Sequence, residues 1–107
     1  MKILFLCTAN KNRSKTAEDY FSAQNDGNEY RSAGLSYKWC ERYGTTICTE
    51  DLLAWANKIY VFEDLHIERI KEYAGTAYLG KITNLNIPDH FKYMDGHLIK
   101  LIKSSLS

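Results

Sequence analysis

The sequence predicts a single α/β domain built on a four-stranded parallel sheet with helices on both faces. At 107 residues, the chain has room for one hydrophobic core. Strand-like and helix-like segments alternate along it in the order βαβαβαβα, and this alternation favours parallel strands joined by right-handed crossovers. The first segment holds four consecutive large apolar residues, Ile3 to Leu6, as expected of a strand buried on both faces. We therefore expect residues 1–107 to form one domain.

The four expected strands are short apolar or β-branched runs that stop at a cysteine or at turn residues. They span Lys2 to Cys7, Glu29 to Ala33, Lys58 to Phe62 and Lys81 to Leu85, of which the last has the weakest pattern. In a parallel sheet of this kind, ligands bind beyond the carboxyl ends of the strands, where the strand order reverses. The loop after the first strand is the natural place for a site.

The expected helices carry apolar residues at steps of three and four positions. They run from about Ser14 to Gln24, from the capping Thr49 to Ala56, from Asp64 to Ala74, and onward from Asp95, which caps the last one. On the first helix, the inward face is expected to hold Ala17, Tyr20, Phe21 and Gln24. Residues 35–48 are predicted to be mostly loop with one short helical turn, and residues 86–94 to form a loop around Pro88.

Composition and charge exclude several classes of function. The formal net charge is +1, so no basic or acidic excess indicates binding to nucleic acid or to a membrane surface. No apolar run reaches the roughly 18 residues of a transmembrane helix. The three cysteines, Cys7, Cys40 and Cys48, form no Cys-x-x-Cys pair, which disfavours a disulfide framework and a zinc site. We expect a cytoplasmic protein that needs no metal and no cofactor and binds neither nucleic acid nor membrane.

Residues Cys7 to Ser14 carry the strongest functional signal, because they join a predicted strand to a predicted helix. A loop of this kind turns successive backbone N–H groups inward, and the helix N-terminus adds its positive dipole end. Arg13 can place its planar fork on two oxygens of a phosphate. The same field stabilises a nucleophilic thiolate at Cys7, to which Ser14 can donate a hydrogen bond. Read alone, Cys7 and Arg13 also fit a buried structural cysteine and a solvated arginine.

The run Cys7-Thr8-Ala9-Asn10-Lys11-Asn12-Arg13-Ser14 resembles the phosphate loop of the low-molecular-weight protein tyrosine phosphatases and of the related thioredoxin-coupled arsenate reductases. Ala17-Glu18, Ser32-Ala33-Gly34 and Lys58 to Asp64 resemble further segments of that family, so the resemblance extends along the whole chain. The chain is shorter than typical members, most visibly between Gly34 and Thr49. The resemblance implies a four-stranded parallel sheet, in agreement with the alternation of elements.

The resemblance also implies a role for each residue of the loop. Cys7 resembles the nucleophile that forms a phosphocysteine, and Arg13 with the loop N–H groups resembles the phosphate cradle. The residues expected around the phosphate are Thr8, Ala9, Asn10, Lys11, Asn12, Arg13 and Ser14. Asn10 and Ser32 resemble residues that hold the loop in shape, and Ser14 resembles the serine that tunes the thiolate. The implied activity is hydrolysis of phosphotyrosine, in a phosphorylated protein, or of a similar small aryl phosphate.

Displacement of a phenolate or alkoxide needs a proton donor on the far side of the phosphorus. The family supplies an aspartate from a loop before the last helix, normally in Asp-Pro, whereas this chain has Pro88-Asp89 there. Asp89 is the predicted general acid and then general base, although it also fits a turn residue after the only proline. Asp95 is the rival, but it fits a helix cap better.

Aromatic residues near both loops are candidates for the walls of a substrate pocket. They are Tyr37, Trp39, Phe91 and Tyr93, and packing of loops onto the core is an equally good interpretation of them. Asn12 stands where many family members have a second cysteine, so that form of redox protection is absent. Lys11 places a positive charge at the mouth of the site, which favours an anionic substrate.

Two other functions remain open at this stage. The chain fits a non-catalytic module that binds phosphate or another oxyanion if the acid is not positioned. It also fits an arsenate reductase that passes a disulfide from Cys7 to Cys40 and Cys48, although the reductases carry that pair later in the chain. The three histidines, His66, His90 and His97, form no metal-ligand spacing and are expected at the surface, with His90 a possible neighbour of the acid.

Overall fold

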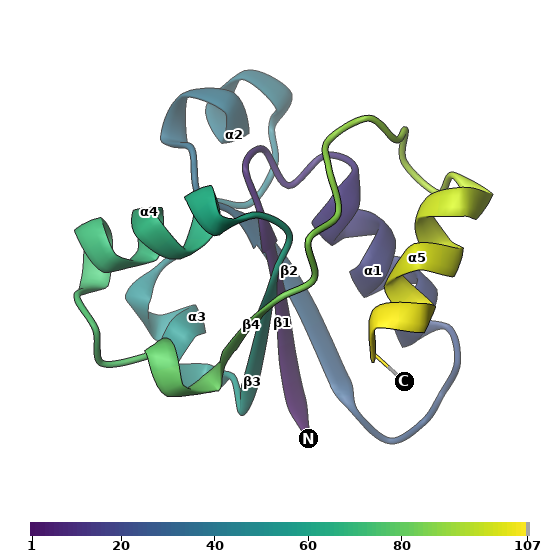
Figure 1. Cartoon of the computed structure of the whole chain (residues 1–107), viewed down its shortest axis with the longest axis horizontal. Coiled ribbons are helices and arrows are strands. Elements are labelled where there is room, and N and C mark those ends of the chain that lie inside the picture. Colours follow the sequence, from purple (N-terminus) through teal and green to yellow (C-terminus); the bar gives the residue numbers. More distant parts are fainter. Residues whose placement is uncertain (107) are drawn as a thin grey trace.

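The computed structural model describes residues 1–106 and contains one four-stranded parallel sheet with the strand order β2-β1-β3-β4 (Figure 1). The strands are β1 (Lys2–Cys7), β2 (Glu29–Gly34), β3 (Lys58–Val61) and β4 (Ile82–Asn84). This confirms the predicted fold class and the boundaries of the first strand. β4 is shorter than predicted, because Lys81 belongs to a short 3-10 helix, η1 (Leu79–Lys81), and Leu85 lies beyond the ladder.

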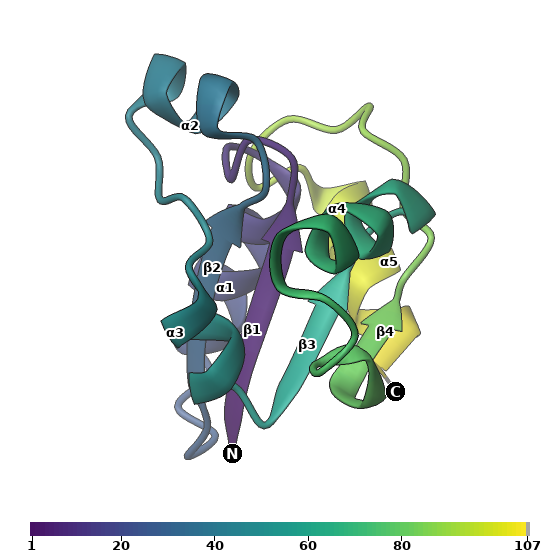
Figure 2. The same cartoon turned by 90° about the vertical axis from the view of Figure 1, so that its left-hand side faces the viewer.

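Helices cover both faces of the sheet and one of its ends (Figures 1 and 2). They are α1 (Arg13–Ser22), α2 (Tyr37–Tyr43), α3 (Glu50–Trp55), α4 (Asp64–Ala74) and α5 (Gly96–Leu106). α1 and α5 pack on one face and α3 and α4 on the other, while α2 stands at the carboxyl end of the strands. No helix among residues 1–106 combines the length and apolarity needed to cross a membrane.

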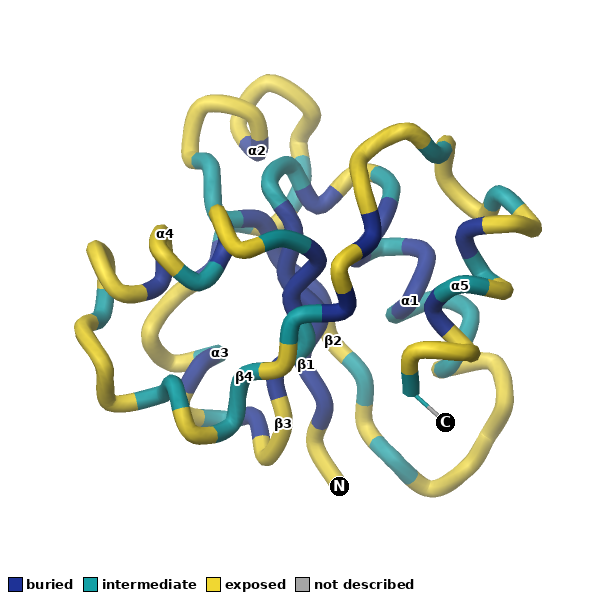
Figure 3. The backbone as a smooth tube through the Cα atoms, in the orientation of Figure 1, coloured by how far each residue is buried: buried dark blue, intermediate teal, exposed yellow. Residues whose placement is uncertain are grey.

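The core is divided by β1 into two halves, because successive side chains of a strand point to opposite faces. Ile3, Phe5 and Cys7 face the half that α1 and α5 cover, and Leu4 and Leu6 face the half under α3 and α4. In Figure 3, the central strands are largely buried, while much of the outer helical turns and loops is exposed. The sheet is thereby a rigid base for the loops at its carboxyl end.

Residues 35–48 differ from the prediction, which was mostly loop. They contain α2, a helix of seven residues, because Ser36 and Gly44 supply its two caps. The Ser36 side chain accepts a hydrogen bond from the Trp39 N–H, and Gly44 takes the left-handed conformation (φ 65°) that ends helices. The capping signals were present in the sequence, but the helix has only one buried residue, Cys40, and therefore no apolar stripe.

The inward face of α1 was also predicted wrongly in part. Its buried residues are Arg13, Ser14, Thr16 and Ala17. Gln24 lies beyond the helix and is exposed, while Tyr20 and Phe21 are only partly buried. The first turn of α1 buries polar side chains because it faces the loop after β1, so hydrophobic periodicity does not identify this face.

Strand order places the loops after β1 and β3 side by side. The chain moves from β1 to β2 on one side and then to β3 on the other side of β1. Such a reversal leaves a crevice outside the carboxyl ends of the two central strands, where ligands of α/β proteins bind. The loop from Thr8 to Asn12 and the turn from Phe62 to Glu63 both open into this crevice.

Candidate active site

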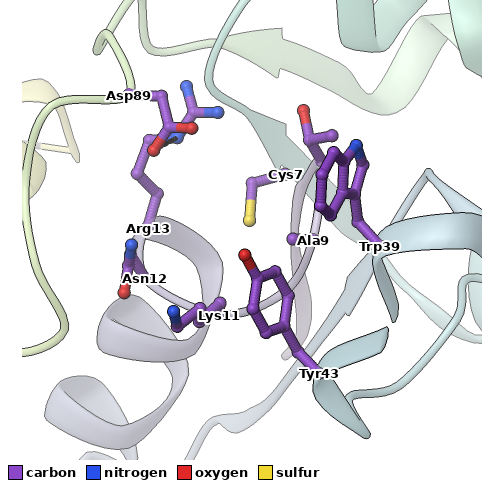
Figure 4. A pocket seen from close by; sticks show the side chains of 9 residues that line it. Cys7, Ala9, Lys11, Asn12, Arg13, Trp39, Tyr43 and Asp89 are labelled. Carbon is purple, nitrogen blue, oxygen red and sulfur yellow. Dashed lines mark ion pairs between the residues drawn. The ribbon is translucent and has the colours of Figure 1, made fainter. Parts of the chain in front are cut away.

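A pocket of about 360 Å³ lies in this crevice, and its lining comes from three separate parts of the chain. Figure 4 shows the Cys7 side chain between Arg13 and Asp89 on one side and Trp39 and Tyr43 on the other. The lining residues are Cys7, Thr8, Ala9, Lys11, Asn12, Arg13, Trp39, Tyr43 and Asp89. The structure therefore brings the predicted nucleophile, arginine and acid into one pocket, although Asp89 is more than seventy positions from the loop in sequence.

Behind the pocket, a buried hydrogen-bond network orients the Cys7 thiol. Cys7 Sγ lies 2.9 Å from Ser14 Oγ, and Asn10 Nδ2 donates to Ser14 Oγ and Ser32 Oγ at 2.8 Å each. Because Ser14 Oγ already accepts from Asn10, its own hydrogen is left for Cys7 Sγ or for the more distant Ala33 carbonyl at 3.4 Å. A hydroxyl hydrogen of Ser14 is thereby within reach of the sulfur.

The loop backbone is shaped as an anion-binding nest. Asn10 has φ 54°, a left-handed conformation that asparagine tolerates better than most residues. Within the described chain, no backbone N–H from Thr8 to Ser14 donates a hydrogen bond to another residue. Consecutive unpaired N–H groups at a helix N-terminus create a positive potential that suits a phosphate. Gly34 permits this loop to approach closely, because a Cβ there would lie 2.8 Å from the Thr8 carbonyl oxygen.

Arg13 is almost fully buried and is held by two acceptors on one side of its guanidinium. Nη1 donates to Glu63 Oε2 at 2.7 Å and to the Ile87 carbonyl at 2.9 Å. Nε has no hydrogen-bond partner and is the only such buried side-chain atom in the described residues. A buried guanidinium with one edge fixed and an Nε–H without a hydrogen-bond acceptor can donate that N–H to an anion, and the Asp89 carboxylate with which Nε forms an ion pair is 3.7 Å away. Glu63 was not predicted as a site residue, since the sequence placed it only inside the segment Lys58 to Asp64.

His66 was expected at the surface, and the structure corrects this: the side chain is 1% exposed. Its Nδ1 accepts from the Phe62 and Glu63 N–H groups at 3.2 Å each, so Nε2 carries the proton and donates to Thr8 Oγ1 at 3.0 Å. Burial, and next the positive charge of Arg13, lower the His66 pKa to about 4, and the ring is neutral at pH 7. His66 thus ties the turn that carries Glu63 to the phosphate loop.

Asp89 and Asp95 occupy different environments. Asp89 is 61% exposed, and its Oδ1 lies 3.7 Å from Arg13 Nε at the edge of the pocket. Asp95 instead accepts from the His97 and Leu98 N–H groups at 2.8 and 3.1 Å, as the N-cap of α5. Asp95 therefore serves as a helix cap through Oδ1 and does not line the pocket over Cys7, whereas Asp89 lines it.

The aromatic walls are only partly as predicted. Trp39 lines the pocket, but Tyr37 points into a separate cavity beside α4. Phe91 packs on the core and against His97, and the Tyr93 hydroxyl donates to Asp19, so neither reaches the pocket. Tyr43 takes their place: its ring stacks with Trp39 (centroids 6.0 Å apart), and Lys11 Nζ lies 4.2 Å from its centroid. Because α2 is a helix, residues four apart stand on one face, which the expected loop did not reveal.

The two remaining cysteines lie outside the pocket. Cys40 and Cys48 are both buried. Burial raises the pKa of the Cys40 thiol and raises the pKa of Cys48 to about 12, so both stay protonated at neutral pH. Thiolates, not thiols, attack disulfides. A disulfide relay from Cys7 through this pair is therefore not favoured.

Known structures share this architecture. Comparison with protein-family models and with curated proteins finds no match to the sequence. Among solved structures, SP-PTP, a low-molecular-weight protein tyrosine phosphatase from Streptococcus pyogenes, has a TM-score of 0.77 at 17% identity over 97% of this chain and 87% of that chain. This chain has the low-molecular-weight phosphatase fold. The fold implied by the phosphate-loop resemblance is thus confirmed.

Two further structures with the low-molecular-weight phosphatase fold match over nearly the whole chain. Wzb from Vibrio vulnificus, solved with benzylphosphonate, has a TM-score of 0.78 at 22% identity over 97% of this chain and 92% of that chain. The arginine phosphatase YwlE, solved as a mutant with a phosphorylated active-site serine, has a TM-score of 0.74 at 21% identity over 99% of this chain and 93% of that chain.

Proposed function

We propose that the chain is a cysteine-dependent phosphatase that hydrolyses phosphotyrosine or similar aryl phosphate monoesters. The observation that carries the proposal is that one pocket contains Cys7 Sγ, the loop that holds the unpaired backbone N–H groups from Thr8 to Ser14, and buried Arg13, whose Nε has no hydrogen-bond acceptor. Three equatorial phosphate oxygens need such a set of donors at the moment of transfer. The fold shared with tyrosine and arginine phosphatases supports the same reaction class.

In the first step, the Cys7 thiolate attacks phosphorus while the bond from phosphorus to the ester oxygen breaks. The loop N–H groups and Arg13 hold the equatorial oxygens, and the Asp89 carboxyl gives its proton to the leaving oxygen. The products are a phosphocysteine and a neutral phenol. Glu63 keeps Arg13 in place through the 2.7 Å ion pair, so the guanidinium does not have to reorganise.

In the second step, water attacks the phosphocysteine opposite the sulfur. The Asp89 carboxylate, half-open to solvent, takes a proton from that water, and the bond between phosphorus and sulfur breaks. The electron pair returns to Cys7 as a thiolate, which the Ser14 hydroxyl at 2.9 Å stabilises. Inorganic phosphate leaves, and neither step requires a metal ion.

The pocket walls favour an aryl phosphate over a phosphoarginine. Trp39 and Tyr43 form an aromatic wall on one side of Cys7 (Figure 4), against which a phenyl ring can pack. Lys11 adds a positive charge beside this wall, 4.2 Å from the Tyr43 ring centroid. A phosphorylated guanidinium keeps a delocalised positive charge, which Lys11 repels.

The proposal is tested with the reduced full-length protein and p-nitrophenyl phosphate. We expect hydrolysis between pH 5 and 8 with competitive inhibition by vanadate, and loss of turnover in Cys7→Ser with Cys48→Ser as the matched control, because Cys48 lies outside the pocket. Phosphate binding without turnover would instead identify a non-catalytic oxyanion-binding module. Arsenate reduction with thioredoxin that disappears in Cys40→Ser would identify a reductase.

A further inference from the structure

Three pockets follow one another across the surface from the phosphate loop to α4. The pocket over Cys7 includes Thr8, and Thr8 also lines a small depression of about 20 Å³ with Ser36 and Arg69. Arg69 in turn lines a cavity of about 470 Å³ between α2, the segment before α3, and α4. Figures 1 and 2 both show α2 and α4 facing each other across this region. The shared residues place the three pockets next to one another, and we call this row of pockets the groove.

Hydroxyl groups along the middle of the groove are free to donate. Thr8 Oγ1 accepts from His66 Nε2, and Ser36 Oγ accepts from the Trp39 N–H, so both hydroxyl hydrogens remain available. The depression between the two larger pockets is too small for a side chain. The depression instead fits the extended backbone of a bound peptide, whose carbonyl groups can accept hydrogen bonds from these two hydroxyls.

The far cavity is apolar at its base and charged at its rim. Leu35, Ile47 and the protonated Cys48 thiol contribute apolar surface, and Tyr73, exposed on α4, contributes an aromatic edge. Arg69 and Glu72 both line this cavity, but only Arg69 also lines the small depression nearer the phosphate loop, and it forms no ion pair with another described residue. An unpaired cation beside an apolar cavity complements an acidic residue followed by an apolar one.

We infer that this groove binds the polypeptide that carries the phosphorylated residue, with an acidic side chain at Arg69 and an apolar side chain in the cavity beside Tyr73. The inference rests on the proposed phosphatase function and adds that the substrate is a protein segment with defined neighbours. An extended chain advances about 3.5 Å per residue, so the apolar residue lies a few positions from the phosphorylated one. Because the groove leaves the phosphate pocket on one side, a peptide that binds in a single direction has its apolar residue on one side of the phosphorylated residue.

The test is a positional scan of phosphotyrosine nonapeptides that differ from a polyalanine background by one acidic and one leucine residue. We expect kcat/KM to rise about tenfold when leucine occupies one position three to five residues away, on one side only. An adjacent acidic residue should add about a threefold gain at low ionic strength. Tyr73→Ala should lower the leucine preference. A scan with no preferred position, or equal preferences on both sides, would overturn the inference.

Charge reversal on α4 distinguishes an effect on peptide binding in the groove from an effect on phosphate hydrolysis. Arg69→Glu should lower kcat/KM for the acidic peptides about fivefold and leave p-nitrophenyl phosphate within about twofold. Lys71→Glu is the matched control, since Lys71 is exposed on the same helix, pairs only with Glu68 and lies outside the groove. Equal effects of Arg69→Glu on both substrates, or equal effects of the two variants, would contradict the groove.

Failure of the proposed function has a different signature. If p-nitrophenyl phosphate is not hydrolysed, the phosphatase assignment fails, and the peptides are compared by fluorescence anisotropy as ligands. Tighter binding of the acidic leucine peptide, lost in Arg69→Glu and kept in Lys71→Glu, would still support the groove. Binding that ignores the flanking residues would overturn it.

Discussion

The loop after β1 is buried and cross-linked by hydrogen bonds, whereas the segment from Leu85 to Asp95 that faces it is largely exposed. Asn10, Arg13 and Ser14 are all nearly inaccessible, and each has partners from other elements. In the facing segment, Leu85 and Ile87 are buried and Phe91 is partly buried against the core, while Asp89 and most of the other residues are exposed. One half of the pocket is therefore fixed, and the other half is accessible.

The difference follows from what each half has to do. A phosphate cradle lowers a barrier only if its dipoles are already oriented, which requires buried and satisfied supports. A group that passes protons to a leaving oxygen and from water needs contact with solvent and few fixed partners. Substitutions in the first loop should therefore change stability and activity together, and substitutions at exposed positions of the second segment should cost much less stability.

The largest effect is expected from Asp89→Asn in the accessible half. Loss of the proton donor should lower kcat for p-nitrophenyl phosphate by about 10²- to 10⁴-fold, with stability unchanged within about 0.5 kcal/mol. Asp95→Asn is the matched control, because asparagine also caps helices and should preserve both quantities. Steady-state kinetics and urea denaturation measure the two. If Asp95→Asn caused the greater loss of kcat, the general acid would be the cap residue instead.

The second effect is the pH dependence of the free energy of unfolding that arises from His66, which supports the fixed half. Its pKa in the folded protein is about 4, below the value of 6.5 in the unfolded chain, so the folded state binds fewer protons between these pH values. The resulting stability is fully present above pH 6.5 and is lost as pH falls towards 4, a change of about 3 kcal/mol. Urea denaturation at pH 7.5 and 4.5 should show a smaller decline for His66→Asn than for the parent.

His97→Asn provides the control for that experiment, because His97 is exposed at the start of α5. Carboxylates titrate in the same range in all three proteins, so the difference between them isolates His66. A decline as steep in His66→Asn as in the parent would show that the buried ring does not carry the pH dependence.

The third effect compares two asparagines with the same backbone conformation. Asn10 and Asn86 both have φ 54°, but Asn10 is buried with three side-chain hydrogen bonds, and Asn86 is exposed in the facing segment. Asn10→Ala should cost about 2–4 kcal/mol and lower kcat at least about tenfold, because it leaves the supports of Ser14 unpaired. Asn86→Ala should cost about 1 kcal/mol. Similar losses of stability in both variants would remove the proposed contrast between the two halves.

The smallest effect concerns substrate choice at the edge of the fixed half. Lys11→Ala should raise the ratio of kcat/KM for a phosphoarginine peptide to that for a phosphotyrosine peptide by about fivefold, because it removes one exposed positive charge. Lys15→Ala is the control, since Lys15 pairs with Glu18 and Asp19 and lies outside the pocket over Cys7. An unchanged ratio would show that Lys11 does not select against cationic substrates.

The sequence predicted the sheet and the main features of the fixed half because local signals determine both. A strand run that stops at Cys7 and a helix entrance at Arg13 place the loop without any knowledge of distant residues. Thr49 and Asp95 were recognised as caps, and the structure confirms both through hydrogen bonds to Leu52 and Leu98. These interactions join residues only three positions apart, so they can be predicted from the local sequence.

The remaining site residues depend on contacts that no local pattern records. Glu63 meets Arg13 across 50 positions and His66 meets Thr8 across 58. The pairing of Glu63 with a buried arginine is visible only once β1 and β3 are known to be neighbours. Tyr43 was not predicted as a pocket residue for a different reason. α2 buries only one side chain, so it has no apolar stripe from which a helix could be recognised in the sequence.

The central claim is that Cys7 becomes covalently phosphorylated in the fixed half of the pocket. Acid quenching of the protein during turnover of p-nitrophenyl phosphate, followed by intact-mass and peptide mass spectrometry, tests it most directly. We expect a protein heavier by one phosphoryl group, located on Cys7, in the parent and in Cys48→Ser, and no such group in Cys7→Ala, which has no nucleophilic atom at this position. Turnover without a phosphorylated Cys7, or a phosphoryl group on another residue, would contradict it.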